Sequence, residues 1–272
     1  MPPPRRQATS PVLRDRVLSA AVFGPIVVAC GYFGHPWFTL LCALALGLGA
    51  KEFGELGRRA QQQVSPVLSA AVASALALER GFAGGRYSPF VLATGVLCSA
   101  VIYVLVAKPG SRCFEGWAIT VTGFVYVGFL GSHLVALRSL PRGIAWLGLA
   151  VITIWVSDSS AYFVGRAWGK RRLAPYLSPR KTWEGAVAGA LSAVLAAAVI
   201  GRIGSLPISA SLLSGALMGC LCPFGDLAVS MLKRQVGVKD TSNLIPGHGG
   251  VLDRLDTLLF SAPIVYWLAV LA

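Results

Sequence analysis

The side chains in this sequence best suited to chemistry are acids that lie in or beside strongly apolar segments. Asp253 and Asp256 stand three residues apart in VLDRLDTLLF, and Asp226 lies in another apolar segment. Carboxylates at this spacing share one face of a helix. With Asp226 they would form a hard, oxygen-rich site that suits Mg²⁺ or Mn²⁺ together with substrate phosphates. Favourable pairing with a helix N-terminus explains one of these acids but not the set.

A short basic segment, YLSPRKTWEG, predicts an anion site. Ser178-Pro179 favours a turn, and Thr182 or Ser178 is expected to cap a helix that begins near Trp183. The free N–H groups of a helix N-terminus attract phosphate, and two adjacent cations add to the attraction. The alternative is an ordinary basic loop with a helix cap. The candidate phosphate-binding residues here are Ser178, Arg180, Lys181 and Thr182.

A second segment, FGDLAVSMLKRQVGVKDTSNLIPGHGG, begins with a helical pattern and then becomes rich in glycine. Ser230 and Lys233 follow Asp226 on the same helical face, although a Lys-Arg pair alone is typical of a helix end. The glycines that follow permit close approach of the backbone to a ligand and can form anion-binding nests. His248, which is flanked by glycines, has no evident packing role. Arg254 could hold a phosphate with two parallel hydrogen bonds.

Asp158 interrupts a further apolar segment, WVSDSSAYFVGRAWGKRR, with serines on both sides. An ionisable side chain inside a membrane helix costs about 2.5–3.5 kcal/mol and is a functional hypothesis by default. We expect Asp158 to face a polar cavity below one membrane surface. The alternative is a cluster of hydrogen bonds between helices.

The elements that position these residues are transmembrane helices. Hydrophobic residues make up 55% of the 272 residues and charged residues 13%, against about 25% charged residues in soluble domains. The chain is therefore expected to be an all-α, multi-pass membrane bundle, because a barrel would show short alternating segments. The predicted helices cover residues 17–34, 36–50, 64–79, 89–107, 117–137, 143–165, 185–204, 208–229 and 256–272.

The distribution of basic residues predicts the orientation in the membrane. With nine spans, 19 of the 24 Lys and Arg residues fall on the side of the N-terminus. Cytoplasmic loops carry this excess, so we expect a protein of the cytoplasmic (inner or plasma) membrane, with its N-terminus in the cytoplasm and its C-terminus outside. The net charge of +13 is explained in the same way, and no nucleic-acid partner is expected. The six cysteines have no metal or redox spacing and are interpreted as structural.

The composition divides the chain into two regions. Residues 1–150 form about five generic helices, with their acids at helix edges or in loops, and are expected to provide scaffold, dimer contacts and lipid access. Residues 151–272 hold the polar clusters and are expected to be the catalytic region, with its site at the cytoplasmic face.

The segment SMLKRQVGVKDTSNLIPGHGGVLDRLD resembles the signature of the phosphatidate cytidylyltransferases, also called CDP-diacylglycerol synthases. LSPRKTWEG and SDSSAYFVGRAWGK are also similar to that family, with Arg180 where a lysine is common. Over residues 1–150 the likeness is only one of hydropathy and of the start LRDRVLSA. The resemblance implies that CTP and phosphatidic acid give CDP-diacylglycerol and pyrophosphate in phospholipid synthesis, with Mg²⁺ (or Mn²⁺, and room for a second cation), in a homodimer.

The resemblance, combined with the residue types, suggests a role for each candidate. The metal ligands are expected to be Asp226, Asp253 and Asp256. The expected catalytic residues are Asp226, Asp253, Lys181 and Lys233. The expected substrate-binding residues are Ser178, Arg180, Lys181, Thr182, Ser230, Lys233, Arg234, Lys239, Asp240, His248, Gly249, Gly250, Arg254 and Asp158.

Three other functions are compatible with parts of the sequence. A secondary transporter would explain the acids in the membrane and the broken helices, but not the basic and glycine-rich segments gathered at one face. A CTP-dependent lipid kinase, or a cytidylyltransferase for another lipid phosphate, would use a similar site. A purely structural membrane protein would not need the acid cluster.

Overall fold

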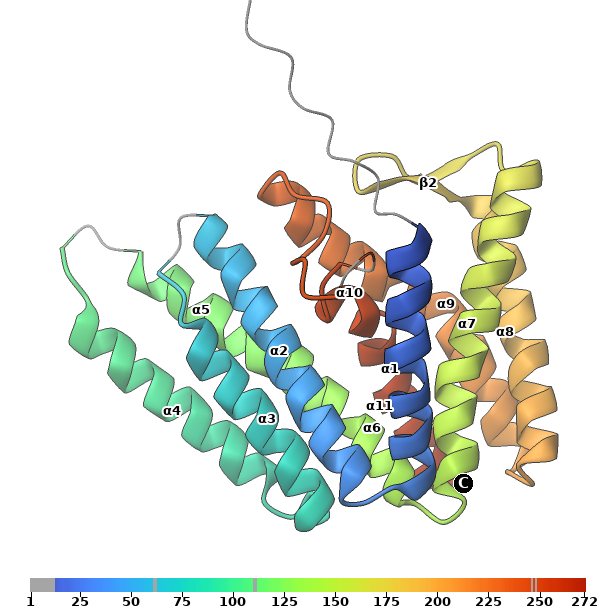
Figure 1. Cartoon of the computed structure of the whole chain (residues 1–272), viewed down its shortest axis with the longest axis horizontal. Coiled ribbons are helices and arrows are strands. Elements are labelled where there is room, and N and C mark those ends of the chain that lie inside the picture. Colours follow the sequence, from blue (N-terminus) through green and yellow to red (C-terminus); the bar gives the residue numbers. More distant parts are fainter. Residues whose placement is uncertain (1–12, 61–62, 110–111, 246, 248) are drawn as a thin grey trace, which may run out of the picture.

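The computed structural model describes residues 13–60, 63–109, 112–245, 247 and 249–272, which form a bundle of long helices (Figure 1). A single two-stranded hairpin, β1 (Arg172–Ala174) and β2 (Ser178–Thr182), is present in this part of the chain. A π-helical segment, η1 (Phe124–Phe129), joins α5 to α6. The α-helices are α1 (Leu13–Phe33), α2 (Trp37–Arg59), α3 (Pro66–Phe82), α4 (Ser88–Val106), α5 (Cys113–Gly123), α6 (Leu130–Ser139), α7 (Gly143–Trp168), α8 (Trp183–Ile203), α9 (Ile208–Gln235), α10 (Leu252–Leu255) and α11 (Leu258–Leu271).

The predicted all-α membrane class is confirmed. Every predicted segment coincides with helix, and among the described residues 7 helices are long and apolar enough to cross a membrane. Large apolar side chains also point outward along the bundle, with Leu105 79% and Ile203 81% exposed. Exposure on this scale suits contact with lipid rather than water.

Several helices extend beyond the apolar stretches from which they were predicted. The structure continues α2 to Arg59 and α9 to Gln235, whereas hydropathy predicted ends at residues 50 and 229. Lys, Glu, Arg and Gln favour helix as strongly as Leu does, so helix continues where hydropathy falls. The extension places Glu52 inside α2 and buries it, which corrects the expectation that this acid lies at a helix edge.

One local prediction near the site was wrong. Ser178 and Pro179 lie in strand β2, and the turn is formed by residues 175–177 just before them. Proline is tolerated there because both strands of a two-stranded sheet are edges. The last predicted helix, residues 256–272, corresponds to α11, and Asp253 lies before it in the four-residue α10. Asp256 and Thr257, between α10 and α11, keep right-handed helical backbone angles.

Small residues bring the helices of the site close together. Ser157 of α7 donates a hydrogen bond to the carbonyl of Gly189 in α8 at 3.0 Å. Further along the same stripe of small residues on α8, Gly215 of α9 packs against Ala193 and Ala197. Close approach of this kind is characteristic of membrane helices, and it fixes α7, α8 and α9 as one unit.

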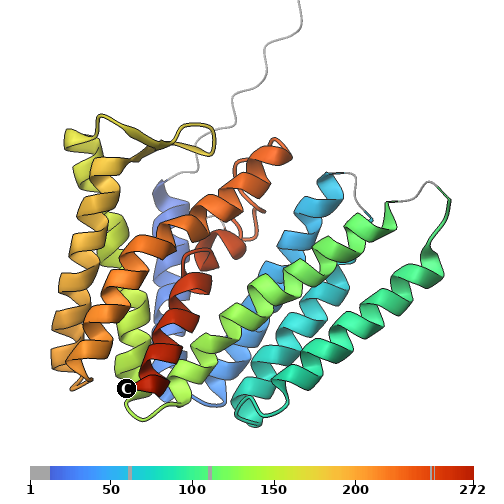
Figure 2. The same ribbon diagram turned by 180° about the vertical axis from the view of Figure 1, so that it is seen from behind.

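The polar segments gather at one end of the bundle. The hairpin, the C-terminal ends of α2 and α9, and α10 all lie near the top of Figure 1, and Figure 2 shows the same arrangement from behind. Pro223 lies inside α9, and in Figure 2 this helix changes direction along its length. A proline in a helix removes a backbone hydrogen bond and produces such a bend.

Candidate active site

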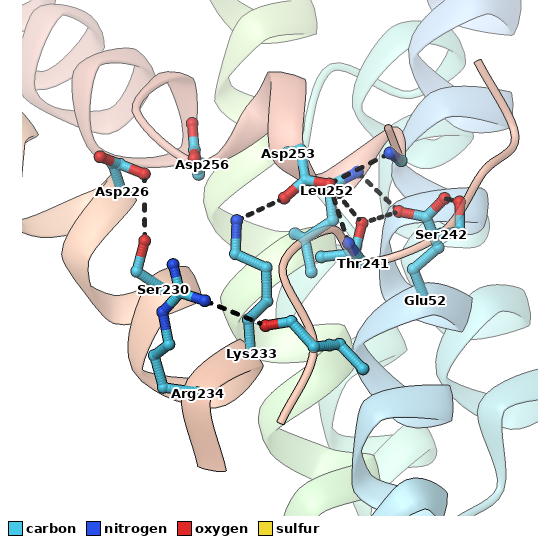
Figure 3. A network of polar contacts seen from close by, with 12 residues as sticks. Glu52, Asp226, Ser230, Lys233, Arg234, Thr241, Ser242, Leu252, Asp253 and Asp256 are labelled. Carbon is cyan, nitrogen blue, oxygen red and sulfur yellow. Dashed lines mark hydrogen bonds and ion pairs between the residues drawn. The ribbon is translucent and has the colours of Figure 1, made fainter. Parts of the chain in front are cut away.

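The C-terminal half of α9 carries three of the predicted residues on one face (Figure 3). The hydroxyl of Ser230 donates to Asp226 Oδ1 at 3.4 Å, as the spacing of four residues predicted. Lys233 extends from the next turn to Asp253 Oδ1, at 2.7 Å. The two side chains are only 11% and 6% exposed, so this ion pair is largely shielded from water.

Asp253 is bound on both of its carboxylate oxygens. Oδ1 pairs with Lys233, and Oδ2 accepts hydrogen bonds from Thr241 N at 2.9 Å, Thr241 Oγ1 at 3.0 Å and Gly250 N at 3.1 Å. Asp253 thus fixes the glycine-rich segment between α9 and α10, which the sequence predicted as a phosphate cradle. The backbone of that segment closes on itself where Ile245 N donates to Gly249 O at 2.9 Å.

Asp226 and Asp256 form the second acidic element of the site. Gly225 packs against the carbonyl of Asp256, so α9 and the α10–α11 junction touch at this point. Asp256 is only 8% exposed, and its Oδ1 accepts the N–H of Thr257 at 2.7 Å. Figure 3 shows Asp226 on α9 and Asp256 between α10 and α11 on neighbouring parts of the chain. Two neighbouring carboxylates repel each other, so a nearby positive charge stabilises them.

The hairpin supplies one such charge. Lys181 Nζ lies 2.6 Å from Asp226 Oδ2 and also donates to the carbonyl of Pro223 at 3.3 Å. Arg234 of α9 reaches back to the carbonyl of Leu177 at 3.4 Å. Thr182 caps α8 by accepting the N–H of Gly185, which confirms one of the two predicted caps. The hairpin therefore contacts α9 at two places, through Lys181 and through the carbonyl of Leu177.

Asp158 lies on α7, beside a small gap that Ser157, Cys222 and Pro223 also line. The gap lies against the part of α9 just before Asp226, where Lys181 donates to the carbonyl of the same Pro223. The predicted polar cavity is thus represented only by this narrow gap, at the point where α9 contains its proline.

The remaining predicted ligands surround these groups. Ser178 is half-buried in β2, Ser230 is buried, and Gly249 lies against Asp240 with a positive φ of 81°. His248 lies outside the described residues. The exposed charged side chains at this end are Arg180, Arg234, Lys239, Asp240 and Arg254. The structure gathers these residues, and their contacts with substrate stay a prediction.

The donor atoms fit a hard divalent cation, although three acids do not meet at one point. Within the described residues no group of three or more His, Cys, Asp or Glu side chains is placed to hold a metal ion. Asp226 and Asp256 supply two carboxylates, and Mg²⁺ commonly takes one or two together with substrate phosphates. Asp253 already has donors on both oxygens. The predicted set of three ligands stays a prediction.

Sequence reasoning missed two polar residues from the N-terminal half. Glu52 of α2 contacts the glycine-rich segment, and Tyr126 of η1 lies within electrostatic reach of Asp256 and Asp226. The Tyr126 hydroxyl is buried and has no hydrogen-bond partner among the described residues. π-Helical turns are frequent at functional sites. The one available signal for Glu52 was an acid within GLGAKEFGELG, a segment rich in small residues that favour close packing.

Comparison with known proteins gives a consistent result. The sequence profile of the cytidylyltransferase family matches residues 14–272. A phosphatidate cytidylyltransferase of Brucella abortus (strain 9-941) is 36% identical over 266 residues, covering 93% of this chain and 92% of the relative. The Pseudomonas aeruginosa protein of the same name is 33% identical over 266 residues, covering 93% and 95%. The Bacillus subtilis protein of that name is 40% identical over 150 residues, or 54% and 56% of the two chains.

Proposed function

Since the chain belongs to the cytidylyltransferase family, we propose that it is a phosphatidate cytidylyltransferase, which converts CTP and phosphatidic acid into CDP-diacylglycerol and pyrophosphate. The observation that carries the proposal is the ion pair of Lys181 with Asp226, next to the buried Asp256, at the polar end of an apolar bundle. A soluble nucleotide and a membrane lipid can both reach such a place.

The reaction joins two phosphates. An oxygen of the phosphatidate phosphate forms a bond to the α-phosphorus of CTP, and the bond from that phosphorus to the bridging oxygen of the β-phosphate breaks. The electron pair of the broken bond leaves with pyrophosphate. Because the attacking oxygen is already an anion, no strong general base is required, and positioning and charge neutralisation supply most of the rate enhancement.

The residues of the site suit these requirements. Lys181 and Lys233 are held at fixed positions by their ion pairs with Asp226 and Asp253. Each ammonium group has three N–H donors, so it can also donate a hydrogen bond to an incoming phosphate. The exposed guanidinium groups of Arg234 and Arg254 are suited to bind phosphate oxygens with two hydrogen bonds. A divalent cation held by Asp226 and Asp256, with Asp253 as the third predicted ligand, would supply neutralisation of phosphate charge.

The distribution of Lys and Arg indicates which side of the membrane the site faces. The end of the bundle that carries the hairpin and α10 is the end with the predicted excess of Lys and Arg, so we assign it to the cytoplasm. CTP is then available from the cytoplasmic side. A homodimer without nucleic acid is expected from the family resemblance, and light scattering of the purified protein in detergent checks it.

The test is an assay with purified protein, phosphatidic acid in mixed micelles, Mg²⁺, and CTP labelled at either the α- or the γ-phosphate. The proposed reaction transfers the α-label to the lipid fraction and releases the γ-label as pyrophosphate. Transfer of the γ-label to lipid would instead identify a CTP-dependent lipid kinase. Absence of turnover with phosphatidate, while a polyprenyl or ether-lipid phosphate is used, would contradict the proposed substrate.

A further inference from the structure

Glu52 is a carboxylate from the N-terminal half of the chain that is buried in the site without a basic partner among the described residues. It lies on α2 and is only 4% exposed. The hydrogen bonds that its carboxylate accepts from described residues all come from the segment between α9 and the start of α10, about 190–200 residues further along the chain (Figure 3).

Both oxygens of Glu52 are used. Oε1 accepts the hydroxyl of Ser242 at 2.6 Å and the N–H of Val251 at 3.0 Å. Oε2 accepts the hydroxyl of Thr241 at 2.9 Å and the N–H of Leu252 at 2.8 Å. A buried carboxylate is stable only when it is hydrogen-bonded in this manner, and bonds to a charged acceptor are about twice as strong as neutral ones. Glu52 therefore joins both ends of the glycine-rich segment to α2.

The packing around Glu52 is specific to this arrangement. Gly49, one turn earlier on α2, contacts Leu252 and Leu255, so α2 and α10 lie close together. Gly250 has no room for a side chain, because a Cβ there would collide with Thr241 Oγ1 and with the Glu52 carboxylate. The segment can take up this path only with α2 in place.

The contacts continue from Glu52 to the predicted catalytic groups. Thr241 Oγ1 lies within hydrogen-bonding distance of both Glu52 Oε2 and Asp253 Oδ2, at 2.9 and 3.0 Å. Asp253 in turn pairs with Lys233 at 2.7 Å. A displacement of the Glu52 carboxylate is thus transmitted through Thr241 to the carboxylate and ammonium groups of the site.

We propose that Glu52 is a positioning residue for the cytidylyl transfer: it holds Thr241 and Ser242 at one end of the glycine-rich segment, and residues 251–252 at the other, in the positions that fix Asp253 and Lys233. The inference deepens the proposed function and rests on it. Glu52 is not itself expected to touch the substrate, because its oxygens are already occupied by four donors.

The informative change is Glu52→Gln, which keeps the size of the side chain. Each carboxylate oxygen accepts a backbone N–H, from Val251 on one side and Leu252 on the other. Whichever way the glutamine amide is turned, its NH₂ group faces one of these N–H donors. Glu55→Gln is the matched control, because Glu55 lies one turn later on α2 and only pairs with Lys51 at 3.5 Å, with the two side chains 38% and 50% exposed.

We expect Glu52→Gln to lower kcat by about 10- to 100-fold, the range that corresponds to loss of a hydrogen bond to a charged group. KM for CTP and phosphatidate should change less than about threefold, because positioning acts on the reacting geometry rather than on initial binding. Hydrogen exchange at the amides of residues 249–252 should accelerate about 10-fold, with exchange in α4 unchanged. Glu52→Asp should recover part of kcat, and Glu55→Gln should match the wild type in every measurement.

The hydroxyl groups that donate to Glu52 give a second test, which can still be made if Glu52→Gln fails to fold. In that event, Ser242→Ala and Thr241→Val must each lower kcat and accelerate exchange at residues 249–252. If Glu52→Gln folds, the effect of Ser242→Ala should largely disappear in its background, since the two groups act through one contact.

The proposal is overturned if Glu52→Gln, or the two hydroxyl variants in its place, leaves exchange at residues 249–252 unchanged. It is also overturned if kcat falls no further than in Glu55→Gln. If the wild type itself shows no cytidylyl transfer, the proposed function fails, while the exchange measurements still decide whether Glu52 holds the segment.

Discussion

The buried ion pair between Lys233 and Asp253 gives a prediction whose magnitude follows from the structure. Lys233→Met keeps the length of the side chain and removes its charge. Asp253 then retains two backbone donors on Oδ2, with Thr241 Oγ1 also 3.0 Å away, but Oδ1 loses the partner that lies 2.7 Å away. Removing one member of a buried pair costs about 3–5 kcal/mol, and the remaining donors favour the lower end, about 3 kcal/mol. At about 2–4 °C per kcal/mol, we expect Tm to fall by about 6–12 °C.

The assay is thermal unfolding of the purified protein in detergent, followed by tryptophan fluorescence. Lys51→Met is the matched control, because the Lys51–Glu55 pair lies 3.5 Å apart and its side chains are 50% and 38% exposed. An exposed pair of this kind contributes up to about 0.5 kcal/mol, so Tm should change by less than about 2 °C. The double variant Lys233→Met/Asp253→Asn should recover roughly half of the lost stability, since no unpaired charge stays buried.

Two results would refute this reasoning. If Lys233→Met shifts Tm no more than Lys51→Met does, the pair is not shielded from water as its exposure indicates. If the double variant is no more stable than Lys233→Met, the loss does not come from an unpaired carboxylate at position 253.

Three further predictions concern the site. Gly250→Ala should reduce activity at least about 100-fold, because the new methyl group collides with Glu52; Gly24→Ala, whose Cβ meets nothing within 4 Å, should leave activity at the wild-type level. Asp226→Asn should lower kcat/KM at least about 100-fold and raise the Mg²⁺ concentration for half-maximal activity, and normal metal dependence would remove it from the ligand set. Tyr126→Phe removes a hydroxyl that has no partner among the described residues, so Tm should stay within about 2 °C while turnover falls about 10-fold; unchanged turnover would exclude a role for that hydroxyl.

Local patterns in the sequence predicted most of the fold and the general composition of the site. Hydropathy located every long helix, because burial in lipid acts on each segment separately. The spacing between Asp226 and Ser230 predicted their contact, and Thr182 was expected to cap α8. Such features depend on a few neighbouring residues, so they can be recognised without knowledge of the rest of the chain.

Local sequence patterns could not predict which groups Asp253 and Asp256 each contact. Spacing alone placed the two acids on one helical face, but it could not show which groups each acid meets. In the structure Asp253 pairs with Lys233, whereas the carbonyl of Asp256 lies against Gly225. Both partners belong to α9, so these contacts depend on how the elements pack together.

The sequence by itself determined that this protein is a helical membrane protein with an acidic and basic site at one end of its helices. Only the tertiary structure decided that Glu52 belongs to that site. Its hydrogen bond to Leu252 spans 200 residues, and no periodicity or spacing relates positions so far apart. The contact exists because α2 and α10 pack together through Gly49 and Gly250, and the cost of burying a carboxylate then requires the donors that surround it.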